Sequence, residues 1–127
     1  MMNERFRQSE HLKSGRLIQR VFAQGKAIKA YPILAMSYHS AELNLPHPQV
    51  GFVAPKRRLP KAVHRNAVKR KMREAYRLHR DAQGLATITN TAIMFVYLKN
   101  DLCSLAELET SMLKLMEKLL RNSHNTQ

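Results

Sequence analysis

The apolar positions in the first part of the chain predict one short helix. After a polar start, apolar residues recur at the i, i+1, i+4, i+5 spacing that places them on one helical face. They are Leu17, Ile18, Val21 and Phe22. Ser14 precedes this run as a candidate cap, and Gly25 follows it as a candidate C-terminal stop. We therefore expect a helix between Ser14 and Gly25.

Three apolar runs further along the chain predict strands. PILAMSYH at 32–39 predicts a strand with Pro32 at its first position, where the missing N–H does no harm. VGFVA at 50–54 predicts a second strand, which we expect to pair antiparallel with the first, and the pattern leaves room for a third short strand after it. AIMFVYL at 92–98 is too short and too uniformly apolar for a surface helix, so we expect a buried central strand.

Two longer segments predict helices, at residues 62–80 and from SLAE onward, where Ser104 and Glu107 form a capping box. The last helix has an apolar stripe that should pack on the sheet: Leu105, Leu108, Met112, Leu115, Met116 and Leu119. The order α-β-β-(β)-α-β-α predicts a small α/β two-layer sandwich. We expect residues 1–127 to form one domain, with 1–13 and 122–127 flexible.

Composition adds a strong positive charge to this picture. The 127 residues include 22 Lys and Arg against nine Asp and Glu, a formal net charge of +13. Self-repulsion of this size is tolerated when a polyanion neutralises it, and nucleic acid is the first candidate. An anionic membrane surface is the second, although no apolar run approaches the roughly 20 residues that span a bilayer. The single cysteine, Cys103, fits a reducing cytoplasm, where we expect the protein to work.

The positive charge is concentrated in one segment, because 11 of the 22 basic residues lie between positions 56 and 80. On a helical wheel, one side of helix 62–80 carries Arg65, Asn66, Lys69, Arg70, Arg73, Tyr76, Arg77 and Arg80. The opposite side carries Ala67, Val68, Met72, Ala75 and Leu78, with His64, Lys71 and His79 among them. The helix is therefore expected to be amphipathic, with its apolar side on the sheet and its cationic side outward.

Two interpretations of the cationic side are open. Ordinary solvated helix surfaces mix signs, because Glu–Lys pairs at i, i+4 stabilise a helix and like charges oppose it. Here cations repeat at 65, 69, 73 and 77 without a compensating acid on that arc, which favours a surface for a polyanion. The preceding loop extends this surface with Lys56, Arg57, Arg58 and Lys61. Asn66 fits two roles equally: it caps the first turn, or it reads a base edge or a hydrated metal near phosphates.

No pattern points to catalysis by a protein side chain. The six histidines are scattered without ligand spacing, and one cysteine cannot complete a zinc site. The chain has neither a G-x-x-x-x-G-K-[ST] loop nor a G-x-G-x-x-G loop. We therefore expect a binding protein that has no catalytic residues and no metal ligands of its own.

The order of these motifs resembles the protein subunit of bacterial ribonuclease P. FAQG ends the first helix, VGFVA and KRR follow, and AVHRNAVKRKMREAYR forms the basic helix, so the likeness runs from about Leu17 to Leu120. The positions that match the family's A-V-x-R-N-R-x-K-R-x-x-R-E element are Ala62, Val63, Arg65, Asn66, Lys69, Arg70, Arg73 and Glu74. Ala67 departs from this pattern, because the family has a second arginine there, and this departure should weaken one RNA contact.

The resemblance implies a fold, an activity and partners. The family's fold is a compact α/β sandwich whose strand–helix–strand crossover through the basic helix is left-handed, against the usual rule. In the family, the RNA subunit holds Mg²⁺ and removes the 5′ leader of precursor tRNA, and the protein alone binds no cofactor. The implied partners are ribonuclease P RNA and precursor tRNA, with no membrane and no DNA.

The matched positions also imply site residues. The basic loop and helix would contact the catalytic RNA through Lys56, Arg57, Arg58, Lys61, Arg65, Asn66, Lys69, Arg70, Arg73 and Arg77. A cleft between the first helix and the sheet would hold the single-stranded leader, with walls at Ile18, Phe22, Met36 and Tyr38. Ile18 stands where the family often has an aromatic residue. As a residue considered alone, Phe22 fits core packing better.

Other classes of protein share part of this pattern. A ribosomal or assembly protein that binds folded RNA would have the same charge and a similar sandwich, and only the pattern from Arg65 to Arg73 with its flanks argues against it. A helix-turn-helix DNA-binding protein would need a second helix shortly before 62–80, where 50–61 predicts strand and loop. A polybasic membrane-binding protein would need a hydrophobic wedge beside the charges.

Overall fold

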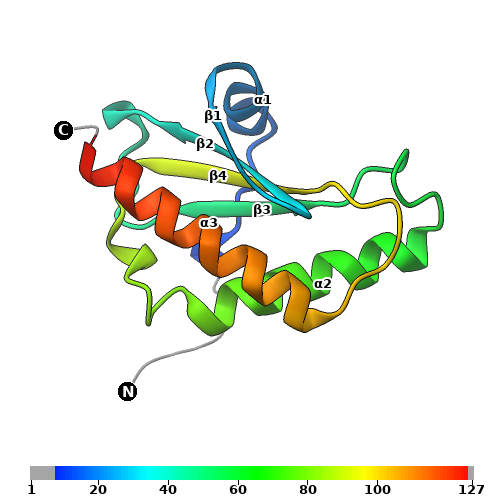
Figure 1. Cartoon of the computed structure of the whole chain (residues 1–127). Helices are drawn as coiled ribbons and strands as arrows, with labels where there is room; N and C mark the ends of the chain where they lie inside the picture. The colour runs from blue at the N-terminus through cyan, green and yellow to red at the C-terminus, as the bar shows by residue number, and fades with distance from the viewer. Residues whose placement is uncertain (1–7, 126–127) are drawn as a thin grey trace.

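A computed structural model describes residues 8–125, and residues 1–7 and 126–127 lie outside that description. Three main helices and four strands are arranged along this part of the chain, together with three short 3₁₀ segments (Figure 1). In chain order they are η1 (Gln8–Glu10), α1 (Gly15–Gln24), β1 (Lys26–Ala30), β2 (Ile33–His39), η2 (Ala41–Leu43), β3 (Gln49–Val53), α2 (Ala62–His79), η3 (Leu85–Thr87), β4 (Thr91–Tyr97) and α3 (Leu105–Asn125).

Strand β4 lies inside a four-stranded sheet with the order β1-β2-β4-β3. It pairs antiparallel with β2 and parallel with β3, and all of its residues except Val96 are buried. The expected buried central strand is therefore confirmed. The expected antiparallel pair between 32–39 and 50–54 is wrong, because β4, which is apolar on both faces, takes a neighbour on each side and separates them.

The second neighbour of β2 is β1, with which it forms an antiparallel hairpin. The extra strand that we expected after 50–54 thus lies before the first predicted strand. Its sequence, KAIKA, has only two buried residues and carries lysines, as edge strands often do, so its apolar pattern is weak. Strand β2 begins at Ile33, and Pro32 belongs to the hairpin turn, where its carbonyl oxygen accepts from Leu98 N–H at 2.8 Å.

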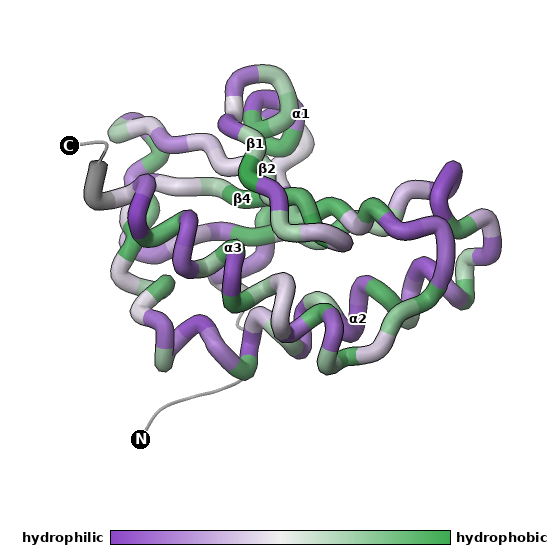
Figure 2. Tube along the Cα trace, in the orientation of Figure 1, coloured by the Kyte–Doolittle hydropathy of each residue, from purple (hydrophilic) through white to green (hydrophobic). Residues whose placement is uncertain are grey.

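Helices cover both faces of the sheet (Figure 1). Helices α2 and α3 pack on one face, in a core that contains Ile93, Phe95 and Tyr97 of β4. Helix α1 packs on the other face, over Ala92 and Met94. Alternate residues of β4 therefore enter two cores, which explains the uninterrupted apolar run at 92–96 (Figure 2). The single-domain α/β sandwich is confirmed, with β3, α2 and β4 as its strand–helix–strand crossover.

Helix α1 begins and ends where the sequence predicts. The Leu17 N–H donates to Ser14 Oγ at 3.2 Å, and the Gly25 N–H donates to the Val21 carbonyl oxygen at 2.8 Å. Gly25 is not left-handed, since its φ is −74°. A Cβ at this position would clash with the Val21 carbonyl oxygen and lie 3.0 Å from that of Ser37. Glycine is needed here because the chain passes close to β2.

At both ends of the described chain, residues that we expected to be flexible are packed or helical. Glu10 and Leu12 are buried, and the Leu12 N–H donates to the Val50 carbonyl oxygen at 2.9 Å, so residues 8–12 pack along the edge strand β3. Helix α3 starts at its expected cap, where the Glu107 N–H donates to Ser104 Oγ at 3.1 Å, and it continues through residues 122–125. The rest of the two segments expected to be flexible, 1–7 and 126–127, lies outside the described residues. No helix between residues 8 and 125 is long and apolar enough to cross a membrane.

Candidate nucleic-acid interface

Helix α2 is amphipathic, and its inner side differs from the helical wheel at one important residue. Val68, Met72 and Ala75 are buried, as expected. Tyr76 is also buried, with its ring centroid 6.0 Å from Phe52 and 5.7 Å from Phe95. The wheel placed Tyr76 on the cationic side, which is wrong, because the helix packs against β3 and α3 together and buries a wider arc than one neighbour would. Leu78, placed on the apolar side, is 42% exposed.

The outer side of α2 presents several cations, two of which have no partner among residues 8–125. Lys69 and Arg70 make no hydrogen bond or ion pair with any residue of the described chain, and Arg73 is exposed beside them. We call this surface the α2 cationic face and define it as Arg65, Asn66, Lys69, Arg70 and Arg73. Like charges at this spacing oppose the helix, so an external polyanion is the partner that this face fits.

Three other basic residues of α2 and its end are engaged within the protein. Arg77 donates through Nε to Glu74 at 3.0 Å, and this hydrogen bond lowers the pKa of the Glu74 carboxyl. We expected no acidic residue to neutralise the cations on this side of the helix, and this is wrong for Arg77, which is paired with Glu74. Arg80 is buried and ion-paired, so it does not belong to the cationic side. Lys71 donates to the Cys103 carbonyl oxygen at 3.1 Å, away from the cationic face, as its wheel position predicts.

Arg65 connects the cationic face to the basic loop before the helix. Its Nη1 donates to the carbonyl oxygens of Leu59 at 3.0 Å and Pro60 at 2.7 Å. Loop residues Lys56, Arg57 and Lys61 are exposed, and Arg58 is half-buried. The structure thus places the basic residues predicted for the loop at the N-terminal end of α2. Arg65 also stabilises the conformation of that loop through its two hydrogen bonds.

Asn66 is exposed and its amide makes no hydrogen bond within the described chain. The helix starts at Ala62 with Lys61 at the cap position, and no side chain caps it. The capping role that the sequence allowed for Asn66 is therefore wrong. An unengaged amide among cations favours the alternative role, contact with a ligand.

The four residues predicted to line a leader cleft lie on or beside the face of the sheet that α1 covers. Ile18, Met36 and Tyr38 are half-buried around the smaller core. Phe22 is 45% exposed, so the core packing that suits this residue type does not apply. The structure brings Ile18, Met36 and Tyr38 together around one core, and Phe22 lies one turn after Ile18 on α1 with its ring exposed.

Sequence reasoning missed His11 and Lys13, which lie near Arg73. Burial, followed by the charges of Arg73 and Lys13, lowers the pKa of the His11 imidazole. These residues approach α2 because Leu12 is held against β3. No local pattern could reveal this, since the contact joins positions far apart in the sequence. The N-terminal segment thereby extends positive charge from the α2 cationic face toward α1.

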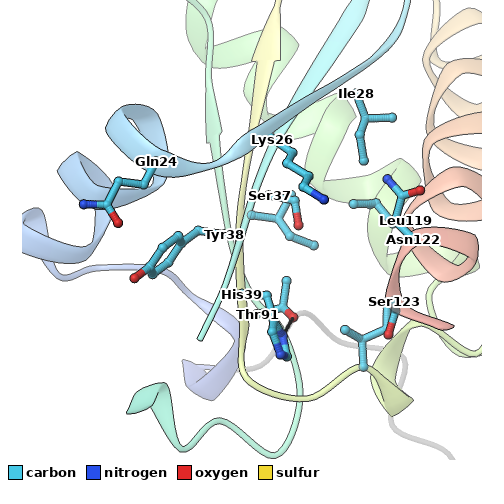
Figure 3. Close-up of a pocket in the computed structure, with 12 residues that line it drawn as sticks. Gln24, Lys26, Ile28, Ser37, Tyr38, His39, Thr91, Leu119, Asn122 and Ser123 are labelled. Atoms are coloured by element: carbon cyan, nitrogen blue, oxygen red, sulfur yellow. Dashed lines mark hydrogen bonds between the residues drawn. The ribbon is translucent and has the colours of Figure 1, made fainter. Parts of the chain in front are cut away.

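A separate hollow of about 230 Å³ lies on the other side of the sheet, between β1, β2 and the C-terminal end of α3 (Figure 3). His39 lines it and is hydrogen-bonded through Nδ1 to Thr91 Oγ1 at 3.2 Å. The Tyr38 ring points away from the α3 residues, toward α1 (Figure 3). Tyr38 also lines the hollow, which therefore borders the surface predicted for the leader.

The described residues offer no metal centre, because no three His, Cys, Asp or Glu side chains among them are grouped to hold an ion. Cys103 is buried, and burial raises the pKa of its thiol, which makes it a poor nucleophile. What this site can do chemically is bind a polyanion along α2 and apolar or aromatic groups beside α1.

Comparison with known proteins identifies the family. A family model described as ribonuclease P matches residues 6–120. The ribonuclease P protein components of two Porphyromonas gingivalis strains, W83 and ATCC 33277, are each 38% identical over 72 residues, which is 57% of this chain and 53% of the relative. This chain thus matches about half the length of these curated relatives.

Solved structures agree on the fold. The RNase P protein of Staphylococcus aureus is similar with a TM-score of 0.69 and 20% identity, over 87% of this chain and 94% of that one. The RNase P protein of Thermotoga maritima is similar with a TM-score of 0.69 and 19% identity, over 86% and 96%. Because the family model covers nearly the whole sequence and the fold agrees, this chain belongs to the ribonuclease P protein family.

Proposed function

We propose that this chain is the protein subunit of ribonuclease P and assists the RNA-catalysed, Mg²⁺-dependent removal of the 5′ leader from precursor tRNA. The observation that carries the proposal is the α2 cationic face, where Lys69 and Arg70 have no ion-pair or hydrogen-bond partner among residues 8–125 and occupy positions that match the family's element. The protein supplies binding energy and position, and its side chains perform no bond cleavage. A cytoplasmic location is part of this proposal.

The catalytic RNA would bind along the α2 cationic face. Arginine guanidinium groups contact phosphates through two parallel N–H donors, while lysine acts as a point charge. Arg70 and Lys69 supply one of each, and neither has to break a hydrogen bond or ion pair with the described part of the chain. Asn66 adds an amide that can both donate and accept, which suits a base edge or a water bound to Mg²⁺.

The single-stranded leader would bind beside α1. Proteins that bind single strands without strict sequence choice combine aromatic rings for stacking with cations that follow the backbone. Phe22 supplies an exposed ring, and His11 and Lys13 lie between this surface and Arg73. A leader on this surface would be continuous with RNA on the α2 cationic face.

The direct test is cleavage of precursor tRNA by a bacterial ribonuclease P RNA at low Mg²⁺ and near-physiological salt, with and without this protein. We expect correct 5′ cleavage with both components and little with either alone. A double variant, Lys69→Gln with Arg70→Gln, should lose most of the stimulation. The matched control, Lys114→Gln with Arg121→Gln on α3, removes the same charge elsewhere and should keep it. Tight binding to unrelated structured RNAs without any rescue of cleavage would instead indicate a ribosomal-type RNA-binding protein.

A further inference from the structure

The neighbouring strands β3 and β4 are parallel, so the loops that follow them meet at the same edge of the sheet. Residues 54–61 follow β3 and carry the basic loop, and residues 98–104 follow β4. In α/β sheets, ligands are commonly bound beyond the carboxyl ends of parallel strands. This end of the sheet is therefore a place where side chains from two loops can converge on one ligand.

Three side chains from these loops converge here. Arg57, Arg58 and Asn100 line an open hollow of about 350 Å³. Arg58 donates through Nη1 to Asn100 Oδ1 at 3.3 Å, which joins the two loops. This contact uses the amide oxygen of Asn100 and leaves its NH₂ group without a partner within the described chain.

The unused hydrogen-bonding capacity of this hollow consists of donors. Arg58 Nε is buried and has no hydrogen-bond partner among residues 8–125, and Arg57 likewise makes no contact of this kind there. A buried donor without an acceptor is unfavourable, so Arg58 gains a hydrogen bond when its guanidinium turns Nε toward an oxygen atom in the hollow. Two guanidinium groups and an amide NH₂ together require a ligand that carries negative charge and several acceptor oxygens, as a phosphate does.

The loop that carries the two arginines is held in shape before any ligand arrives. The Arg58 and Leu59 N–H groups both donate to the Pro55 carbonyl oxygen, at 3.0 and 3.1 Å, and Leu59 is buried. From α2, Arg65 Nη1 donates hydrogen bonds to the carbonyl oxygens of Leu59 and Pro60 in the same loop. Arg65 is therefore a positioning residue for this loop.

The nearby Lys99 does not contribute to the hollow in the same way, because its ammonium group lies 3.3 Å from the Glu107 carboxylate. Helix α2 follows the loop directly at Ala62, so the hollow lies at the beginning of the α2 cationic face. An RNA backbone bound along α2 would reach this hollow at the N-terminal end of the helix.

We propose that Arg57, Arg58 and Asn100 form a phosphate-binding site that takes one phosphodiester group of the RNA bound along α2. The proposal rests on the proposed function, which it extends to a second loop, and it assigns Asn100 a role in RNA binding. A phosphate here would receive hydrogen bonds from both loops and so fix the register of the RNA relative to the helix.

The test uses two substitutions that leave the net charge unchanged. Arg58→Lys keeps the positive charge but removes Nε and the planar fork, and Asn100→Ala removes the amide. We expect affinity for ribonuclease P RNA to fall about tenfold for Arg58→Lys and about fivefold for Asn100→Ala, the range of one lost hydrogen bond. Arg121→Lys on α3 is the matched control and should bind as the unaltered protein does.

A second readout observes the site without the partner RNA. The ¹⁵N-labelled Arg58 Nε–H resonance should shift when inorganic phosphate or a short single-stranded RNA is added, and this shift should be smaller in Asn100→Ala. Unchanged RNA affinity in both variants, or an unmoved Arg58 resonance, would overturn the site. If the resonance shifts with RNA while the unaltered protein rescues no precursor-tRNA cleavage, the site stands and the proposed function fails.

Discussion

The Nε atom of Arg80 lies 3.0 Å from Oε1 of Glu10, and only 3% and 8% of these two side chains are exposed. Asp81 Oδ1 lies 3.8 Å from the same nitrogen. This ion pair fastens the segment before α1 to the C-terminal end of α2. One arginine of a very basic segment thus stabilises the fold, while its neighbours along the helix face outward.

Replacing Arg80 should destabilise the protein and leave its RNA-binding surface intact. Arg80→Met keeps the aliphatic stem but leaves Glu10 as a buried charge, and removing one partner of a buried pair costs about 3–5 kcal/mol. Urea unfolding measures this change in the free energy of unfolding. Arg70→Met is the control, because Arg70 is exposed and its loss should hardly change stability. Equal unfolding midpoints for the two variants would contradict the structural role of Arg80.

Replacing Arg70 should weaken RNA binding in a salt-dependent way. Each phosphate contact contributes roughly 0.7–0.9 to the slope of log affinity against log salt, so Arg70→Ala should make the slope shallower by about that amount. Affinity for ribonuclease P RNA across a KCl series provides the measurement. Lys71→Ala is the matched control, since Lys71 is bound to the Cys103 carbonyl oxygen. An identical change of slope in both variants would show that only net charge matters.

Replacing Phe22 should weaken binding of the 5′ leader and leave binding of the tRNA body unchanged. Loss of one aromatic stacking partner costs about 1–3 kcal/mol, so Phe22→Ala should weaken precursor tRNA binding by that amount and leave mature tRNA unaffected. Affinities of the holoenzyme for the two tRNAs test this. Leu102→Ala, which removes another apolar side chain that is 40% exposed, serves as the control. Equal losses for both tRNAs would place Phe22 outside the leader surface.

Two glycines at the ends of α1 should respond in opposite directions to the same change. Gly25→Ala introduces a Cβ that clashes with the Val21 carbonyl oxygen and should cost about 1–3 kcal/mol. Gly15→Ala introduces a Cβ with nothing within 4 Å and should stabilise the protein by about 0.4–1 kcal/mol, because the unfolded chain loses freedom. Thermal unfolding of both variants provides the comparison. A tolerated Gly25→Ala would mean that α1 can move away from β2.

His11 should titrate below the ordinary histidine value of 6.5, because burial and the charges of Arg73 and Lys13 lower its pKa. The unfolded chain then binds this proton more tightly than the folded protein. The contribution of His11 to stability is therefore present above about pH 6.5 and is lost as the pH falls through the folded-state pKa.

An NMR titration of the His11 ring would measure this pKa in the unaltered protein and in Arg73→Ala. We expect the variant to show a partial rise, since burial is the larger cause and remains. Arg77→Ala is the control, because Arg77 is hydrogen-bonded to Glu74 and should leave His11 as it was. An equal pKa in all three proteins would separate the N-terminal segment from the α2 cationic face.

The elements that the sequence predicts correctly are those whose causes are local. Ser14 and Ser104 cap helices through N–H groups three residues away, and both hydrogen bonds are present. The stripe on α3 and the uniformly apolar β4 likewise depend on spacing within one segment. The cationic side of α2 was also predicted from local spacing, because residues four positions apart on a helix, such as Arg65, Lys69 and Arg73, lie on one side.

The errors concern residues whose neighbours come from elsewhere in the chain. Strand β1 is too short and polar to be recognised alone, and it forms because β2 offers it an edge. Tyr76 and Arg80 belong to the cationic arc by spacing, yet Phe52 and Glu10 draw them into the interior. A helical wheel assumes one buried side, whereas α2 contacts β3 and α3 as well as the segment before α1.

By itself, the sequence determined the helices, three of the four strands, the charge of the outer face of α2 and the family resemblance, because periodicity, capping and composition act within a few residues. Only the tertiary structure decided the strand order and the burial of Arg80 in an ion pair with Glu10. It also decided that the Asn66 amide makes no hydrogen bond within residues 8–125 and that Arg58 donates a hydrogen bond to Asn100. These depend on which distant segments pack together, and that is settled by burying apolar surface while pairing buried charges such as Arg80 and Glu10.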